Sequence, residues 1–463
     1  MNEQQANQAL YQKMTETRIS TLVTGLSIPT IASMLVSALY NTADTFFVSR
    51  LGTSASGAAG IVFSIMAIIQ SIGFMLGMGA GSQISRLLGA QEKKQASVVA
   101  STSFFSALLL GSVIALLGLL FTDPLLKLLG ATSTILPYAA DYAKYIFFGA
   151  PIMCASYVLN NLLRSEGRAA FAMIGITAGG VLNIILDPVF IFVFDLGIAG
   201  AAIATLLSQC TGFLLLLSMF LRKRSALPLH IRNLSHKFID YRNIMVTGFP
   251  SFARQGLASI AAAVLNREAS LYGDAAVAAM SIAGRIFMLI YSVIIGLGQG
   301  FQPVAGHNYG AKRYTRVNEA ILFSAKLGTI AATALSLLIF IFAPQVMAAF
   351  RADDAEVIRI GSFAMRMQCL SLPFMPFYTI SSMTYQVLGK STGATILSAA
   401  RQGIFFLPFV LVLQRAIGLP GIQIAQPISD VCCFTLSLFM MMPLLKELKA
   451  LACNEKEGLP NEI

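Results

Sequence analysis

The sequence predicts an all-α polytopic membrane protein, and three observations lead to that prediction. Of 463 residues, 56% are hydrophobic and only 11% are charged, and the mean hydropathy is +0.74; soluble proteins carry about 25% charged residues. The apolar residues form long blocks, and a helix needs about 20 such residues to cross a bilayer core of about 30 Å. No block shows the ten-residue alternation of a membrane β-barrel. A disordered chain, a disulfide scaffold and a water-soluble enzyme are therefore excluded.

Twelve apolar blocks satisfy the length that a transmembrane helix requires. Glycine and proline occur inside several of them, which membrane helices tolerate better than soluble helices do. The predicted spans lie near residues 22–48, 57–80, 96–121, 138–162, 168–194, 197–221, 243–267, 276–299, 320–344, 358–387, 393–414 and 418–443.

The connections between these blocks predict the orientation of the chain. Of the 32 basic residues, 20 lie in the connections on one side and six on the other. Because basic connections stay in the cytoplasm, both termini are expected there. An even number of spans agrees with this, since it requires the two termini to lie on the same side. Residues 1–20 are polar, so we expect no cleavable signal peptide and place the multi-pass chain in the cytoplasmic (inner) membrane. The net charge of +11 is dispersed over these connections, so we expect the lipid bilayer, and no nucleic acid, as the partner.

The chain divides into two similar halves around a polar linker at 222–242. The glycine-rich segment 77–83 is repeated at 296–302, segment 196–204 at 417–425, and Pro29 at Pro250. Residues 1–221 and 243–463, the latter with a short cytoplasmic tail, are each expected to form a bundle of six helices. Six spans per half make the repeat parallel, with a pseudo-two-fold axis along the membrane normal. This duplication is typical of secondary transporters, and no zinc-peptidase motif or phosphate-binding loop indicates an enzyme.

Ionisable residues inside the predicted spans are candidates for function, because a charge at the bilayer centre costs about 2.5–3.5 kcal/mol. In the N-terminal half, Asp44 and Asp187 have no local partner, and Thr205 lies at a similar depth. Asn183 shares a helix face with Asp187, and Pro188 leaves one backbone carbonyl free. These oxygens suit a bound Na⁺ or a proton. In the alternative interpretation, the aspartates face a water-filled vestibule and only tune its electrostatics.

The C-terminal half has the opposite polarity, with four intramembrane arginines and one clear acid, Asp430. Arginines near the ends of spans reach the interface, but Arg254 and Arg285 lie about ten residues deep. Such residues either bond to the backbone and Asp430 or face a transport cavity. The candidate cavity residues are Arg254, Arg285, Gln302 and Tyr291.

Two segments give the chain a resemblance to the multidrug and toxic compound extrusion (MATE) transporters. Segment 298–311, which reads GQGFQPVAGHNYGA, is similar to the signature after the eighth span of that family. Pro29 followed by Tyr40, Asn41 and Asp44 is similar to the hallmark of its first span. The motif around Arg254 resembles the MepA/DinF-like bacterial branch, and the resemblance covers essentially the whole chain.

The resemblance implies a cation site formed by Asp44, Asn183, Asp187 and Thr205, where Na⁺ could bind. The possible neighbours of that site are Asn160, Tyr40 and Asn41. Pro29 and Pro188 are expected to act as hinges when the cation binds. The acidic site that another branch carries in its C-terminal half appears here as Ala258 and Ser381, so no second cation site is expected.

The expected function is secondary active export of amphipathic, often cationic compounds in exchange for inward H⁺ or Na⁺, by alternating access. We expect a monomer without a cofactor other than this coupling ion. One alternative is a flippase or exporter of an anionic or lipid-linked metabolite, for which the C-terminal arginines would suit an anionic head group. A channel or receptor is the third alternative, and it would bind ligands without concentrating them.

Overall fold

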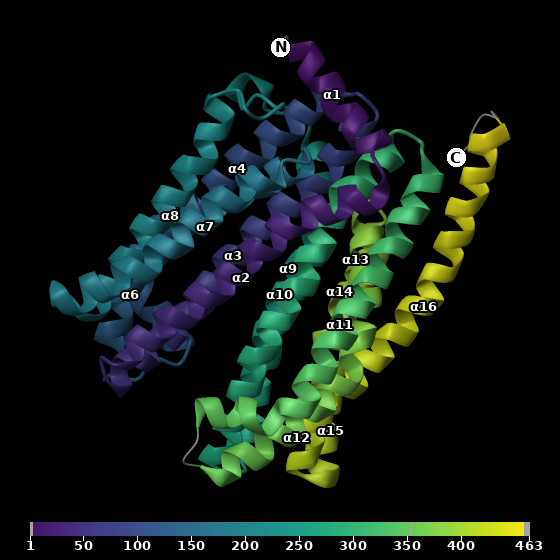
Figure 1. Cartoon of the computed structure of the whole chain (residues 1–463). Coiled ribbons are helices and arrows are strands. Elements are labelled where there is room, and N and C mark those ends of the chain that lie inside the picture. The colour runs from purple at the N-terminus through teal and green to yellow at the C-terminus, as the bar shows by residue number, and fades with distance from the viewer. Residues whose placement is uncertain (1–2, 352–353, 458–463) are drawn as a thin grey trace.

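The computed structural model describes residues 3–351 and 354–457, and Figure 1 shows that they form long helices. Twelve membrane-crossing segments are present in this part of the chain, as the sequence predicts. They are α2 (Ile19–Ser49), α3 (Thr53–Gly89), α4 (Lys93–Leu120), α6 (Leu136–Ser165), α7 (Ala169–Pro188) with η1 (Val189–Val193), α8 (Gly197–Leu221), α9 (Phe238–Ser270), α10 (Asp274–Gly310), α11 (Tyr314–Phe350), α12 (Ala355–Ser371) with η3 (Leu372–Phe374) and α13 (Met375–Val387), α14 (Ser391–Ala399) with η4 (Ala400–Phe406) and α15 (Leu407–Ile417), and α16 (Leu419–Glu457). Shorter helices are α1 (Glu3–Glu16), α5 (Thr122–Leu128) and η2 (Ile231–Asn233).

Within the described ranges, ten of these segments are long and apolar enough to be recognised as spans by composition alone. The other two are α9, which carries Arg242, Arg254 and Arg267, and the tenth span, which a 3₁₀ turn at Pro373 divides into α12 and α13. A helix that is polar on one side can still cross a membrane when that side faces protein or a water-filled cavity. The lower hydropathy of α9 therefore indicates that it lines something other than lipid.

The spans form two bundles that meet at one end of the molecule and separate at the other. In Figure 1 the N-terminal bundle, α2 to α8, runs from purple to teal, and the C-terminal bundle, α9 to α16, runs from green to yellow. Both termini lie toward the end where the bundles meet. This arrangement confirms the predicted two-bundle fold.

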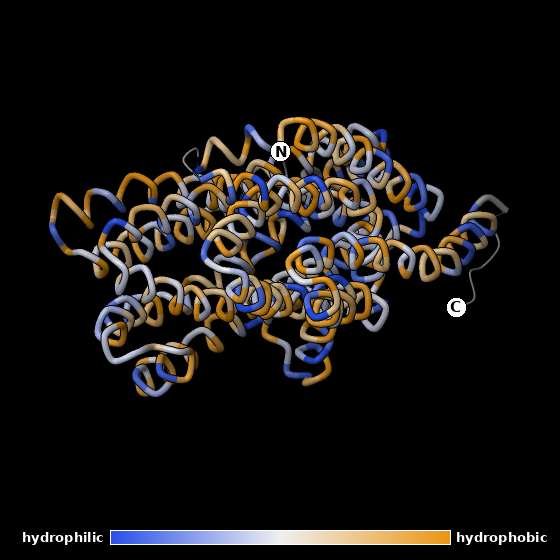
Figure 2. The backbone as a smooth tube through the Cα atoms, turned by 90° about the horizontal axis from the view of Figure 1, so that it is seen from below, coloured by the Kyte–Doolittle hydropathy of each residue, from blue (hydrophilic) through white to orange (hydrophobic). Residues whose placement is uncertain are grey.

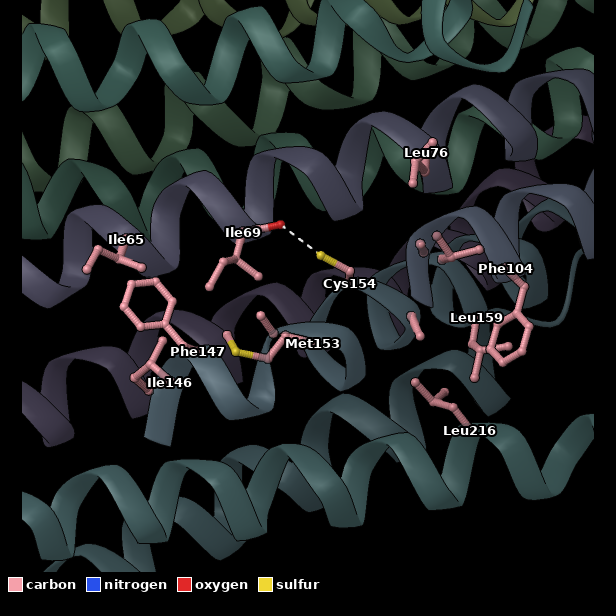
Figure 3. Close-up of a cluster of buried hydrophobic side chains, with 14 of the residues drawn as sticks. Ile65, Ile69, Leu76, Phe104, Ile146, Phe147, Met153, Cys154, Leu159 and Leu216 are labelled. Carbon is pink, nitrogen blue, oxygen red and sulfur yellow. Dashed lines mark hydrogen bonds between the residues drawn. The ribbon is translucent and has the colours of Figure 1, made fainter. Parts of the chain in front are cut away.

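The core of the N-terminal bundle surrounds α6, which is the most buried of its helices. Figure 3 shows Phe147 and Met153 of α6 packed among branched apolar side chains, with the Cys154 thiol donating to the Ile69 carbonyl at 3.5 Å. Large apolar side chains such as Leu109 and Phe439 point outward and are 66% and 68% exposed. Figure 2 shows that hydrophobic stretches occur on the periphery as well as between helices. A bilayer accounts for this exposure, because lipid tails solvate apolar side chains.

Glycines allow the backbones of the two bundles to touch near the terminal end. A Cβ atom at Gly79 of α3 would lie 2.0 Å from the Ile244 carbonyl of α9, and one at Gly248 would lie 1.7 Å from the Met75 carbonyl. The internal repeat relates α3 and α9 to α10 and α2. On this second pair of helices, a Cβ at Gly300 of α10 would lie 2.5 Å from the Cα of Ser27 in α2. Small residues at such crossings let membrane helices approach closely. The repeated glycine-rich segments of the sequence therefore form the contact between the bundles.

The segment between the bundles is anchored to the N-terminal bundle by Glu166, a fully buried residue after α6. Its carboxylate accepts hydrogen bonds from the Ser225 hydroxyl and, at 2.8 Å, from the Ala226 amide. Arg168 lies 3.4 Å from the same carboxylate and also donates to the Arg224 carbonyl. Burial raises the pKa of Glu166 from 4.5 to about 7, and the two hydrogen bonds and Arg168 oppose this rise only in part.

The close approach of α3 and α9 makes a prediction about two glycines of the same helix. Gly248→Ala is expected to lower the free energy of unfolding by about 1–3 kcal/mol, because its methyl group would overlap the Met75 carbonyl. Gly256→Ala is the control, since nothing lies within 4 Å of its added Cβ. Thermal unfolding in detergent measures both variants. Equal stability of the two would contradict the backbone contact.

The anchoring of the linker is expected to depend on pH. The raised pKa means that Glu166 keeps its proton while the linker is docked and loses it when the linker is released. Docking therefore weakens as the pH rises from 4.5 to about 7. Glu166→Gln keeps a neutral acceptor and removes the titration. Limited proteolysis of segment 222–237 would compare the two proteins at pH 5 and pH 8. The ratio of wild-type to variant cleavage rates should increase with pH, and a constant ratio would refute this expectation.

Candidate functional site

Three helices of the N-terminal bundle bring together the acidic and polar residues that the sequence singled out. Asn183 and Asp187 lie one turn apart on α7, and the Asn183 amide donates to the Asp187 carboxylate at 3.1 Å. The same amide lies 3.3 Å from the Thr205 hydroxyl of α8. Asp44 of α2 accepts a hydrogen bond of 3.4 Å from the Tyr142 hydroxyl of α6. Asp44 and Asp187 are within electrostatic range of each other, so these elements form one cluster.

Several buried oxygens of this cluster have no hydrogen-bond partner among the described residues. They are one carboxylate oxygen each of Asp44 and Asp187, and the side-chain carbonyl of Asn183. Asp187 is fully buried, and Asn183 and Thr205 are 2% and 4% exposed. Buried acceptors without a donor are costly, and each one in a native structure needs an explanation. A bound cation could satisfy all three, whereas one added proton could satisfy two, the oxygen that carries it and the acceptor to which it is donated.

The backbone changes its hydrogen-bonding pattern beside this cluster. Pro188 ends α7 and cannot donate a backbone hydrogen bond, and a π-helical turn, Val189–Val193, follows it directly. Pro29, in contrast, lies within an uninterrupted α2. On α2, the Asn41 amide donates to the Ser37 carbonyl at 2.8 Å, and on α6 the Asn160 amide donates to the Ala172 carbonyl at 2.9 Å. Pro188 thus marks an irregular segment next to Asp187.

A cavity of about 240 Å³ lies between the two bundles and adjoins the cluster. A single water needs about 10–15 Å³ in this measure, so the cavity has room for a small organic molecule. Its wall includes Asn183 and Thr205, whereas Asp44 and Asp187 lie behind that wall. The polar and aromatic residues that line it are Ser37, Tyr40, Asn41, Phe63, Gln70, Phe74, Ser156, Tyr157, Asn160, Asn183, Thr205, Ser208, Gln209, Ser251, Arg254, Gln255, Tyr291, Ser292 and Gln299.

The candidate residues of the C-terminal half occupy different surroundings. Arg254 and Tyr291 line the cavity as expected. Arg285 is exposed on α10 and is not part of the cavity wall. Gln302 lies in the contact between helices, where its amide donates to Gln386 at 3.3 Å, and it lines a separate space of about 20 Å³. Of these four residues, the cavity therefore contains two.

Asp430 of α16 neutralises one intramembrane arginine. Its carboxylate accepts from the Arg401 guanidinium at 2.8 Å, from the Gln426 amide at 2.9 Å and from the Ser371 hydroxyl at 3.1 Å. The Arg401 guanidinium also lies over the Tyr291 ring, 4.9 Å from its centre. Both oxygens of the buried Asp430 carboxylate thus accept hydrogen bonds, as a buried charge requires.

Sequence reasoning missed three residues of this region. Tyr142 is a fully packed residue of α6, and only its position beside the exposed Asp141 relates it to the acids in the sequence. Gln255 of α9 donates to Gln70 of α3 at 3.2 Å, and Gln70 donates to the Tyr157 hydroxyl at 2.7 Å. This chain of hydrogen bonds connects the two bundles along the cavity. A polar residue inside an apolar span is the signal that identifies both glutamines.

The donor set indicates which cations the cluster could hold. Across residues 3–351 and 354–457, no group of three or more His, Cys, Asp or Glu side chains is present that could hold a metal ion. Two carboxylates, an amide oxygen and a hydroxyl are hard oxygen ligands, and they lack the nitrogen and sulfur that Zn²⁺ and other transition metals prefer. The set therefore fits Na⁺ or H⁺.

Comparisons with known proteins identify the family of the chain. The MatE family model matches residues 29–189 and 250–412. The multidrug export protein MepA of Staphylococcus saprophyticus is 29% identical over 422 residues, which cover 91% of this chain and 93% of MepA. The structure matches an outward-facing multidrug resistance MATE transporter of the MOP superfamily with a TM-score of 0.90, at 30% identity over 95% of this chain and 98% of that one. It also matches a MATE transporter in the bent conformation with a TM-score of 0.88, at 30% identity over 96% and 99% of the two chains.

One matched region lies in each half of the predicted repeat, and together they span most of the twelve membrane-crossing segments. The resemblance seen in the sequence is thus confirmed over both bundles. The chain belongs to the MatE family of membrane transporters.

Proposed function

We propose that the chain exports amphipathic organic compounds from the cell in exchange for a monovalent cation, H⁺ or Na⁺, by alternating access. The observation that carries this proposal is the group of three buried, unpartnered oxygens beside a cavity with room for a small organic molecule. The multidrug export activity named for the MepA relative agrees with the proposal.

The cation is proposed to bind between Asp44 and Asp187, with Asn183 and Thr205 as the neutral ligands. Two ionised carboxylates within electrostatic range repel each other, and the bundle interior provides little water to screen them. One Na⁺ or one proton would reduce this repulsion, and either would satisfy at least two of the acceptors that have no donor. Loading the site should therefore draw α2, α7 and α8 together.

Coupling between cation and substrate follows from the two residues that both sites share. Asn183 and Thr205 hydrogen-bond within the acidic cluster and also form part of the cavity wall. A movement of α7 or α8 on cation binding must therefore change the shape of the cavity. By reciprocity, a bound substrate must change the affinity for the cation by the same factor.

The conformation supports a direction for the cycle. The bundles touch at the end that carries both termini, which the basic connections place in the cytoplasm. The structure then corresponds to an outward-facing state, in which substrate leaves and the external cation enters. Pro188 with its π-helical turn and Pro29 are the proposed bending points as the bundles rock to the inward-facing state.

The proposal is tested by transport into or out of liposomes that contain the purified protein. A fluorescent cation such as ethidium should move against its concentration gradient under either a pH gradient or a Na⁺ gradient. Asp187→Asn should abolish this concentrative movement, because it removes one of the two charges that bind the coupling ion. Asp141→Asn is the matched control, since Asp141 is an exposed acid of the neighbouring helix α6.

Two results would contradict the proposal. Asp187→Asn protein that still concentrates ethidium would show that the acidic cluster does not couple transport. Wild-type protein that moves ethidium only down its gradient, under both conditions, would indicate a channel or another substrate.

A further inference from the structure

We propose that Arg254 forms, with Tyr291, a subsite for an anionic group of the transported compound, so that zwitterionic aromatic molecules bind better than simple cations. The inference rests on the proposed export function and concerns the substrate class of its cavity. Within the described part of the chain, Arg254 is the one charged residue among those that line the cavity.

The guanidinium of Arg254 has no compensating partner. In residues 3–351 and 354–457, no carboxylate pairs with it and no hydrogen bond satisfies its N–H groups. Arg401, which shares the adjoining recess, is in contrast neutralised by Asp430. A half-buried guanidinium within a membrane protein is expected to pair with an acceptor. A carboxylate on a ligand in the cavity would be an acceptor of the opposite charge.

The surroundings of Arg254 define the chemistry of that ligand. A recess of about 40 Å³ continues from the cavity into the C-terminal bundle and shares Arg254, Gln255 and Tyr291 with it. The Tyr291 ring can pack against an aromatic ring system, and a guanidinium binds a carboxylate through two parallel hydrogen bonds. The opposite wall carries the neutral Asn183 and Thr205, with the acidic cluster behind them. A molecule with a carboxylate at one end and a cationic ring system at the other matches this polarity.

A pair of dyes that differ only in one carboxylate tests the subsite. Rhodamine 110 carries a free carboxylate, and rhodamine 123 is its methyl ester, with the same cationic ring system. Fluorescence anisotropy with purified protein in lipid nanodiscs gives both dissociation constants without any ion gradient. Wild-type protein is expected to bind the acid at least tenfold more tightly than the ester, in the range of a charge-assisted hydrogen bond.

Variants separate the role of the charge from damage to the fold. Arg254→Gln should abolish the preference for the acid, and Arg254→Lys should keep part of the preference. Arg285→Gln is the matched control, because it removes an exposed arginine of α10 that does not line the cavity. It should leave both affinities unchanged.

The outcomes distinguish this inference from the proposed function. A wild-type protein with no preference for the acid, or an Arg254→Gln variant that retains the preference, would overturn the subsite. Gradient-driven transport of the ester by the same preparation would in that case leave the export function intact. If neither dye is transported, the export function fails, whereas the binding preference still decides the role of Arg254.

Discussion

The arrangement of this protein depends on two carboxylates in the interior of a membrane helix bundle. Asp44 and Asp187 come from spans that are distant in sequence, and each has a buried oxygen without a partner. Neutral hydrogen bonds from Tyr142 and Asn183 hold the carboxylates in place but leave their charge uncompensated. Because an unpaired buried charge is costly, the proposed cation would stabilise the bundle. In the proposed mechanism, the gradient of that cation supplies the energy for transport.

The second constraint is the contact between the bundles. At Gly79, Gly248 and Gly300 the helices are so close that a single methyl group would overlap the opposing backbone. Such a contact is either closed or open, with little space for intermediate positions. The cavity lies between the same two bundles, and two of its wall residues belong to the acidic cluster. The proposed mechanism therefore links cation binding, cavity shape and bundle closure through α7 and α8.

Much of the fold could be predicted from the sequence, since twelve apolar blocks and a repeated glycine pattern are local properties of the chain. The grouping of Asn183, Asp187 and Thr205 also followed, because depth in the membrane and helical spacing determine their positions. The side of a helix that faces the cavity was harder to predict. Arg254 and Arg285 have similar depths in their spans, yet one lines the cavity and the other is exposed. Tyr142 could be recognised only once the packing of α6 against α2 was known, whereas the sequence already marks Gln70 as a polar residue inside an apolar span.

The central claim is that substrate and cation bind to sites that influence each other through Asn183 and Thr205. The most direct test measures the cation that ethidium displaces from the purified protein, as protons released into weakly buffered solution or as bound radioactive Na⁺ lost. Ethidium binding is predicted to displace one of the two ions from wild-type protein and neither ion from the Asp44→Asn variant. If ethidium binds to wild-type protein and displaces no proton and no Na⁺, the acidic cluster is not coupled to the cavity, and this account is wrong.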